Sequence, residues 1–215
     1  MIEPKEINVL IACEESQAEC LAFLELGFNA YSCDIQKCRF RPDRHILGDV
    51  TPYLNGCTVG QLQSGDFFAV SHWHLIIAHP PCTYLSKVSS VHMVVKGELQ
   101  PERYEKMKSA AAFFHKCLNA KADYLAVENP IPMRRAGLPR PSCYLHPSWF
   151  GVKYTKKTLY WLRNLPPIMA EIDFPTPKCF CTASRGKYRS RTFPQVATAL
   201  ARQWGSYILD DLNSI

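Results

Sequence analysis

The sequence predicts an α/β fold in which helices flank a mostly parallel β-sheet. Short apolar segments rich in β-branched residues alternate along the chain with longer segments whose apolar residues recur at helical spacing. Such alternation is typical of a parallel sheet built from strand–helix–strand units. The chain has 215 residues, a length that fits one domain. We therefore expect a single domain over residues 1–215.

The first strand–helix–strand unit is predicted within residues 7–35. Residues 7–13 (INVLIAC) form a continuous apolar run, which is expected of a strand buried on both faces of a parallel sheet. Residues 16–26 have helical spacing, and Gly27 is a helix stop directly after them. Residues 29–35 (NAYSCDI) are then predicted to form a second short strand that ends in an acid and an isoleucine.

The later part of the chain continues the same pattern. Residues 74–78 (HLIIA) are predicted to form another buried strand, which Pro80 and Pro81 end. A helix is predicted over residues 101–117, with proline in its first turn and an apolar stripe along one face. Further predicted elements are strands at 124–127 and 158–162 and a closing helix at 193–207.

Composition excludes several classes of protein. Hydrophobic residues make up 47% of the chain and charged residues 20%, which is ordinary globular composition and excludes a wholly disordered chain. No stretch approaches the roughly 18 apolar residues of a membrane span. The ten cysteines occur without a secretion signal, so a reduced compartment is expected. We expect a soluble, cytoplasmic protein.

Positive charge is concentrated in two segments. The net charge is +6, and residues 134–163 and 178–202 contain basic residues but no acidic one. They overlap two stretches without strong periodicity, 131–157 and 163–192, which we expect to be long loops over the carboxyl edge of the sheet. A basic surface of this kind favours a polyanionic partner, or it is an ordinary solvated face.

Residues with reactive or polar side chains follow four of the predicted strands. Since ligands of open α/β sheets bind beyond the carboxyl ends of the strands, we expect these groups to share one edge. Asp34 is a candidate for binding ribose hydroxyls, or it caps a loop. Cys82 follows two prolines and is a candidate nucleophile, or a structural thiol. The four segments are Ala12 to Ser16, Asp34, Pro80 to Cys82, and Glu128 to Pro130.

The order of these motifs resembles a known family. The segments HPPCTYLS, VENP and GDV are similar to motifs of the DNA cytosine-C5 methyltransferases, and more closely to their short, phage-borne branch. Cys82 of the PPC motif precedes Glu128 of the ENP motif by 46 residues (128 − 82). The resemblance covers the whole chain, from IACEES to RSRTFPQVATALARQWG. It implies a Rossmann-like, S-adenosylmethionine-dependent methyltransferase fold, with residues 1–215 as one catalytic domain.

The resemblance also implies the roles of the catalytic residues. Cys82 is the nucleophile that attacks C6 of cytosine, and Glu128 hydrogen-bonds the N3 and N4 edge of the base. Lys156 replaces one of two arginines that the family carries after its aromatic-Gly-Val motif. In duplex DNA the target cytosine is flipped out of the base stack, at a cost of a few kcal/mol.

Further site residues follow from the same resemblance. Asp34 holds the ribose of S-adenosyl-L-methionine, Asp49 its adenine amino group, and Ile35 lies against the adenine ring. The full set expected to bind the cofactor is Ala12, Cys13, Glu14, Ser16, Asp34, Ile35, Asp49, Pro80 and Thr192. The set expected to bind the substrate is Asn129, Arg189 and Arg191.

The chain departs from the family pattern at three places. Glu14 and Glu15 stand where the family has glycines in its first cofactor loop. Thr158 stands where the second arginine is expected, so that Arg189 or Arg191 is a candidate to supply the charge. Only the basic loop 163–192 is available in place of a target-recognition domain, with Phe180 and Tyr188 as candidates to stack on a base.

These departures leave other functions open. The same fold acting on RNA or on a free pyrimidine nucleotide is one alternative, and a catalytically silent nucleic-acid-binding protein is another. The family resemblance requires no metal, and none is expected. Cysteine spacing nevertheless offers four possible zinc ligands, namely Cys143, His146, Cys179 and Cys181.

Overall fold

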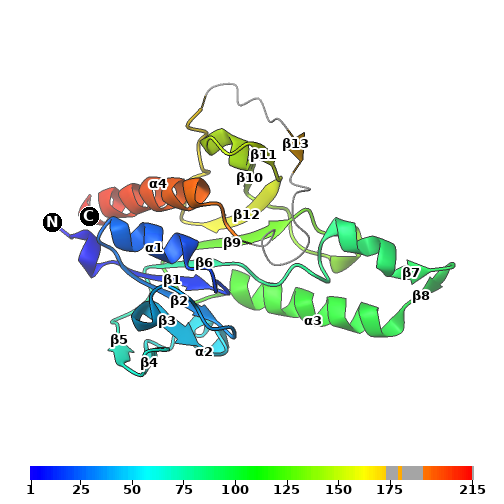
Figure 1. Ribbon diagram of the computed structural model, residues 1–215, viewed down its shortest axis with the longest axis horizontal. Helices are drawn as coiled ribbons and strands as arrows, with labels where there is room; N and C mark the ends of the chain where they lie inside the picture. The colour runs from blue at the N-terminus through cyan, green and yellow to red at the C-terminus, as the bar shows by residue number, and fades with distance from the viewer. Residues whose placement is uncertain (173–178, 181–190, 215) are drawn as a thin grey trace.

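The computed structural model describes residues 1–172, 179–180 and 191–214. Its centre is a seven-stranded sheet with the strand order β10-β12-β9-β6-β1-β2-β3 (Figure 1). The strands are β1 Asn8–Ala12, β2 Asn29–Asp34, β3 His45–Leu47, β6 Leu75–Ala78, β9 Tyr124–Pro130, β10 Cys143–Leu145 and β12 Thr158–Arg163. The five strands from β3 to β9 are parallel, whereas β12 is antiparallel to both β9 and β10. The predicted α/β class with a mostly parallel, Rossmann-like sheet is confirmed.

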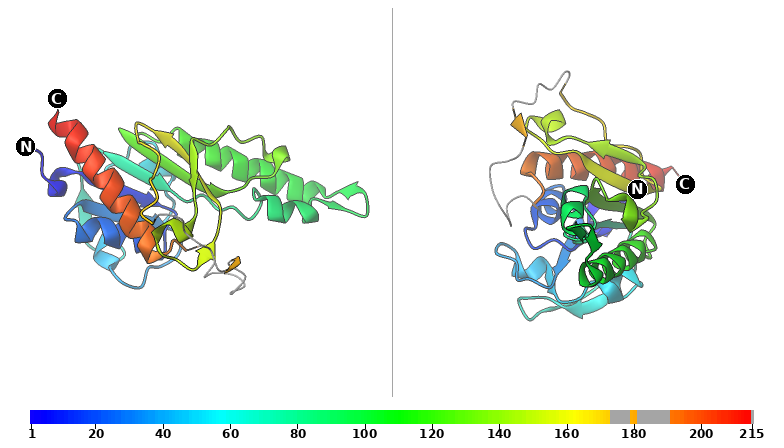
Figure 2. Two further views of the ribbon diagram at one scale, coloured as in Figure 1. Left: turned by 90° about the horizontal axis from the view of Figure 1, so that it is seen from above. Right: turned by 90° about the vertical axis from the view of Figure 1, so that its right-hand side faces the viewer.

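Helices cover both faces of this sheet (Figures 1 and 2). The helices are α1 Ala18–Glu25, α2 Thr51–Leu54, α3 Pro101–Leu118 and α4 Pro194–Asn213. α1 and α4 pack against each other on one face, and α2 and α3 contribute to the core on the other. Successive residues of β1, such as Val9 and Leu10, enter these two opposite cores. All five residues of β1 are buried, which explains the continuous apolar run in this part of the sequence.

Shorter elements lie at the margins of the sheet. The additional strands are β4 Val59–Gln61, β5 Phe67–Ala69, β7 Val94–Val95, β8 Glu98–Leu99, β11 Tyr154–Thr155 and β13 Cys179–Phe180. The 3-10 helices are η1 Pro4–Glu6, η2 Pro42–Arg44, η3 Lys87–His92, η4 Arg134–Ala136 and η5 Pro147–Phe150. The β7–β8 hairpin projects past the end of α3, whereas the two chain termini lie together at the opposite end (Figures 1 and 2). The backbone N–H of Ile2 donates to Asn213 Oδ1 at 2.7 Å and joins the termini.

Most predicted elements are present, with changes at their ends. β9 continues beyond the predicted strand to Pro130, so that Glu128 lies inside a strand and not after it. The closing helix α4 extends to Asn213 because residues such as Leu212 still pack against its core. The prediction of a long loop over 131–157 is wrong in part, since β10 adds an edge strand there.

The structure bears on membrane-spanning helices and on the state of the cysteines. None of the helices in the described ranges is both long and apolar enough to cross a membrane. All eight cysteines for which side chains are described are free thiols. Among them, Cys33 and Cys117 are buried within one hydrophobic core, as expected for cysteines inside apolar runs.

Candidate active site

The four predicted strand-end segments meet at one edge of the sheet. They follow β1, β2 and β6 or form the end of β9, and these strands are parallel. The chain passes from β1 outward through β2 to β3 and then returns to β6 on the other side of β1. The reversal of strand order between β1 and β6 is where open α/β sheets bind ligands. The four segments therefore share one edge of the sheet, as predicted, and they lie around a topological switch point.

The loop after β1 obtains its sharp turns without glycine. Cys13 has φ = 63° and Gln17 has φ = 58°, both in the left-handed region that favours glycine. The side chain of Gln17 is buried and offsets this strain by donating to Ser32 Oγ and to the Arg41 carbonyl. Its Oε1 also accepts the backbone N–H of Arg41 at 2.8 Å. These bonds tie the loop to the segment between β2 and β3.

Glu14 stabilises the start of α1 from inside the protein. Its Oε1 accepts the backbone N–H of Glu19 at 2.7 Å, and its Oε2 accepts that of Cys20 at 3.2 Å. Burial and the neighbouring Glu19 carboxylate raise the pKa of Glu14 to about 8. The carboxyl group therefore faces the helix, while the adjacent Glu15 forms an ion pair with Arg191 at 3.0 Å.

Two carboxylates and one exposed apolar side chain lie at the ends of β2 and β3. Asp34 Oδ1 accepts the N–H of Gln36 at 2.8 Å, and burial raises the pKa of Asp34. Asp49 Oδ1 accepts both the N–H and the hydroxyl of Thr51, and these bonds lower the pKa of Asp49. Ile35 beside Asp34 is 79% exposed. This set can accept hydrogen bonds from hydroxyl or amino groups and cover one face of an aromatic ring.

Cys82 lies within electrostatic range of Glu128 and Lys156. Burial and the Glu128 carboxylate raise the pKa of the Cys82 thiol, whereas the Lys156 ammonium acts in the opposite direction. The turn that carries Cys82 is fixed because its carbonyl accepts the backbone N–H groups of Leu85 and Ser86, each at 3.0 Å. The structure thus brings the three predicted catalytic residues together.

Glu128 presents one oxygen without a partner. Its Oε2 is 3.4 Å from His79 Nδ1, whereas its Oε1 is buried and has no hydrogen-bond partner among the described residues. Burial raises the pKa of Glu128, but the hydrogen bond from His79 and the charges of Lys156 and His79 outweigh burial and lower it. The next residue, Asn129, donates to the Pro80 carbonyl at 3.4 Å, and its buried Oδ1 is likewise unpartnered within the described chain. Such orphaned oxygens are rare in proteins and indicate a place for a polar ligand.

A pocket opens beside Glu128. It contains two of the predicted catalytic residues and two residues from the segment that leads into α4. Thr158 is buried in its wall, and its hydroxyl donates to the Lys156 carbonyl at 3.1 Å. Arg191 enters the same pocket, which is the approach from the C-terminal segment proposed for the missing family arginine. The residues lining the pocket are Glu128, Leu145, Pro147, Lys156, Thr158, Tyr160, Arg191, Thr192, Phe193 and Val196.

Two residues of the site were missed in the sequence. His79 precedes the two prolines, and Glu19 lies on the buried side of α1 with its side chain 0% exposed. His79 Nε2 is 3.1 Å from Glu19 Oε2, and the Thr192 hydroxyl donates to Glu19 Oε1 at 2.9 Å. The available signals were the histidine in HPPC and an acid on the apolar side of an amphipathic helix.

Several predicted residues lie wholly or partly outside the described part of the chain. Arg189, Tyr188 and Cys181 belong to this group, as do the side chains of Cys179 and Phe180. The proposed zinc set is therefore represented only by Cys143 and His146. Burial and the charge of Lys157 lower the pKa of His146. Its buried Nδ1 has no partner among the described residues.

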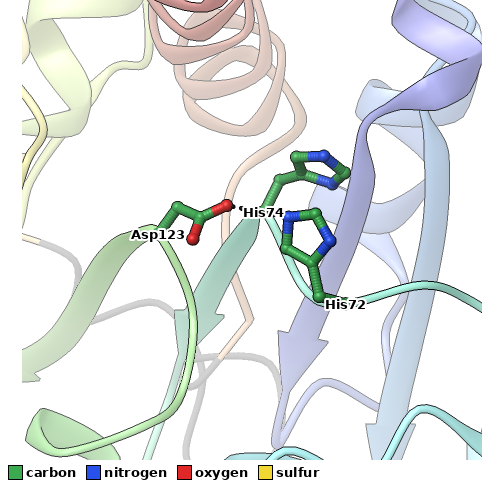
Figure 3. Close-up of side chains that lie close together, drawn as sticks. All are labelled: His72, His74 and Asp123. Atoms are coloured by element: carbon green, nitrogen blue, oxygen red, sulfur yellow. Dashed lines mark hydrogen bonds and ion pairs between the residues drawn. The ribbon is translucent and has the colours of Figure 1, made fainter.

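A second group of metal-ligand residue types lies at the opposite edge of the sheet (Figure 3). His72 Nε2 is 2.9 Å from Asp123 Oδ2, and the rings of His72 and His74 are 4.0 Å apart between centroids. His74 Nδ1, however, accepts the backbone N–H of Asn8 at 2.9 Å. In the neutral ring the proton is then on Nε2, which leaves His74 without a lone pair for a metal. The group is best described as an ion pair between His72 and Asp123 and a tilted contact between the His72 and His74 rings, which together join the amino-terminal ends of β1, β6 and β9.

The comparisons with known proteins give a limited result. No family model matches the chain, and no curated protein matches it. Among solved structures, it is similar to a candidate DNA modification methyltransferase encoded within a prophage of E. coli, with 13% sequence identity and a TM-score of 0.42. The match covers 73% of this chain and 46% of that chain, so this chain spans less than half of the other's length.

Proposed function

We propose that the protein is an S-adenosyl-L-methionine-dependent methyltransferase that acts on C5 of cytosine in DNA. The observation that carries this proposal is that the charges of Glu128 and Lys156, which line one pocket, both act on the thiol of Cys82. The sequence motifs associate Cys82 with the nucleophile, and Glu128 and Lys156 with activation of the pyrimidine ring. A binding protein needs no such thiol beside an unpartnered carboxylate oxygen.

The reaction assigns a balanced step to each group. The Cys82 thiolate forms a bond to C6, and the electron pair of the C5–C6 double bond makes C5 nucleophilic. N3 takes up the proton that the Cys82 thiol gives up, Glu128 Oε1 stabilises this proton at the N3 and N4 edge of the base, and N3 returns it when the thiolate leaves. The methyl group that C5 takes up is the one S-adenosyl-L-methionine supplies. A base then removes the C5 proton, and breaking the S–C6 bond restores the ring and frees Cys82.

The charges around Cys82 define when it reacts. A thiol whose pKa is raised is mostly protonated at neutral pH and is a poor nucleophile. The Lys156 ammonium opposes this rise in pKa. A target cytosine that hydrogen-bonds to Glu128 offsets the carboxylate charge that disfavours the thiolate. We therefore propose that binding of the base activates the nucleophile.

The side chains at the ends of β2 and β3 suit the proposed cofactor. The Asp34 and Asp49 carboxylates suit ribose hydroxyls and the adenine amino group, and exposed Ile35 suits the ring face. The other predicted contacts, from the Ala12 to Ser16 loop, Pro80 and Thr192, remain part of this proposal. Glu14 contributes through the shape of that loop, because both of its oxygens are engaged by α1.

We further propose that Arg191 supplies the charge that Thr158 cannot. Arg191 lines the pocket together with Lys156, and its side chain is 28% exposed. Its planar guanidinium suits a carbonyl oxygen such as O2 of cytosine. Asn129 and Arg189 complete the proposed substrate contacts. The basic loop 163–192 is proposed to replace a target-recognition domain, although residues 173–178 and 181–190 are outside the described ranges.

Nucleoside mass spectrometry of cells that express the protein tests this proposal. We expect new 5-methyldeoxycytidine in DNA with the wild type and none with Cys82→Ser. Cys57→Ser is the matched control, since Cys57 is another partly buried free thiol, which packs against a hydrophobic core between α2 and β4. A methylated ribonucleoside or free nucleotide would replace DNA as the acceptor. No new methylated species in any pool would contradict a methyltransferase and favour the silent binding protein.

A further inference from the structure

His79 is held between two buried carboxylates. Its side chain is 13% exposed, and its two ring nitrogens lie 3.1 Å from Glu19 Oε2 and 3.4 Å from Glu128 Oε2. The backbone is fixed as well, because the N–H of His79 donates to the Ala12 carbonyl at 2.9 Å and two prolines follow. A ring with an acceptor at each nitrogen is best satisfied as an imidazolium, which has two N–H donors.

The same contacts form a continuous chain across the site. Thr192, at the approach to α4, donates to Glu19 Oε1, and Glu19 Oε2 accepts from His79. His79 in turn donates to Glu128 Oε2, which leaves only Oε1 of Glu128 for other partners. Each carboxylate oxygen in this chain of contacts therefore has a partner among the described residues, except Oε1 of Glu128.

This inference rests on the proposed function. We propose that His79 is a positioning residue, which holds Glu128 so that Oε1 is the oxygen that meets the target base. A carboxylate has two equivalent oxygens, and without a partner on one of them the group rotates freely. A charge-assisted hydrogen bond to Oε2 removes this freedom. Glu19 orients the ring of His79 in the same way, as carboxylates do for catalytic and metal-bound histidines.

The arrangement predicts how the effect depends on pH. Burial lowers the pKa of His79, but the carboxylates of Glu19 and Glu128 outweigh burial and hold the pKa well above 6.5. The groups that face this chain of contacts are Glu14 of the loop after β1, Glu19 of α1, Glu128 of β9, Tyr160 of β12, Lys156 and Cys82. As pH rises through the pKa of His79, the ring loses one N–H donor and Glu128 is released. The rate of methyl transfer should therefore fall on the alkaline side.

Two substitutions separate the two nitrogens of the ring. In His79→Asn the amide nitrogen stands at the Nδ1 position and keeps the donor to Glu128. In His79→Gln the amide nitrogen stands at the Nε2 position and keeps only the donor to Glu19. We expect His79→Gln to lower kcat about 10- to 100-fold with little change in KM, the loss usual for an outer-shell partner. We expect His79→Asn to retain most of the wild-type kcat and to lose the alkaline fall in rate.

The measurements are kcat, KM and pH profiles on a cytosine-containing duplex, with thermal unfolding of each variant. Equal loss of kcat in both variants, in proportion to their loss of stability, would show a purely structural role and overturn the proposal. So would an alkaline limb that persists in His79→Asn.

A second measurement does not depend on methyl transfer. Nitrogen NMR of the wild type should show that His79 stays doubly protonated at pH values where a free imidazole has lost its proton, and Glu128→Gln should lower the pKa of His79. An inactive wild type with this NMR result would overturn the proposed function while supporting the pairing of His79 with Glu128. A His79 that titrates identically in the wild type and in Glu128→Gln would overturn the pairing itself.

Discussion

Replacing Glu14 with glutamine should make the protein less sensitive to alkaline pH. Glu14 is 5% exposed, and burial with the nearby Glu19 carboxylate raises its pKa from 4.5 to about 8. A carboxyl whose pKa is raised by folding stabilises the protein fully below pH 4.5, and this contribution is lost as pH rises towards 8. Glutamine has nearly the same shape and remains neutral throughout this range.

The size of the effect follows from the two pKa values. One pKa unit corresponds to 1.36 kcal/mol, so the free energy of unfolding falls by about 5 kcal/mol across the whole window. Between pH 5.5 and pH 7.5 the contribution of Glu14 falls by about 2 to 3 kcal/mol. The variant loses one hydrogen-bond acceptor for the N–H of Cys20, which costs about 1 kcal/mol at every pH. The titration of His79 acts in the same direction in both proteins.

Urea unfolding at pH 5.5, 6.5 and 7.5 measures this difference. With an m-value of about 3 kcal/mol/M, the midpoint of Glu14→Gln should gain about 0.8 M relative to the wild type over these two pH units. Asp43→Asn is a suitable control, because the pKa of this half-exposed carboxyl is lowered by Arg41 and not raised. Parallel pH curves for the wild type and Glu14→Gln would refute the assignment of Glu14 as a buried, mostly neutral cap.

Three further predictions concern separate parts of the molecule. Glu128→Gln should raise the rate of iodoacetamide alkylation at Cys82 several-fold near pH 8, because a like charge is removed, and peptide mass spectrometry will show an unchanged rate if this is wrong. Gly205→Ala should lower stability by about 1–3 kcal/mol in thermal unfolding, since the added Cβ would stand 2.7 Å from Cζ of Phe28, and an unchanged Tm would count against this packing. Asp34→Ala should weaken S-adenosyl-L-methionine binding about 10- to 100-fold in calorimetry, the usual cost of losing a charged acceptor, and equal affinity would remove Asp34 from the cofactor site.

Elements that are buried on both faces could be predicted from the sequence. The run at residues 7–13 is almost wholly apolar because β1 packs against helices on either side, and the side chain of its one polar residue, Asn8, donates hydrogen bonds to Ser71 Oγ and to the His72 carbonyl. Strand β10 could not be predicted, because its three residues are too few to show any alternation and it lies at the sheet edge. Its position depends on pairing with β12, which is a tertiary property.

The residues of the candidate site also differ in whether they could be predicted from the sequence. Cys82 and Glu128 could be named because each follows or ends a strand and belongs to a short motif. The pairing of Glu19 with His79 spans 60 residues and arises only when α1 packs against β1 and β2 of the sheet. Glu14 was expected to contact the cofactor, and its cap on α1 became visible only when the direction of its side chain was known. Local sequence therefore indicates which side chains reach the carboxyl edge of the sheet. The hydrogen-bond partners of those side chains depend on how whole helices and strands pack.

A covalent trap tests the central claim most directly. In a duplex that contains 5-fluoro-2′-deoxycytidine, fluorine at C5 cannot leave as a proton does, so the S–C6 bond cannot be broken by elimination. Wild type and Cys57→Ser, each with S-adenosyl-L-methionine, should form a denaturation-resistant adduct that peptide mapping assigns to Cys82, and Cys82→Ser should form none. Absence of any adduct in the wild type, or an adduct at a different cysteine, would contradict cytosine-C5 chemistry at Cys82.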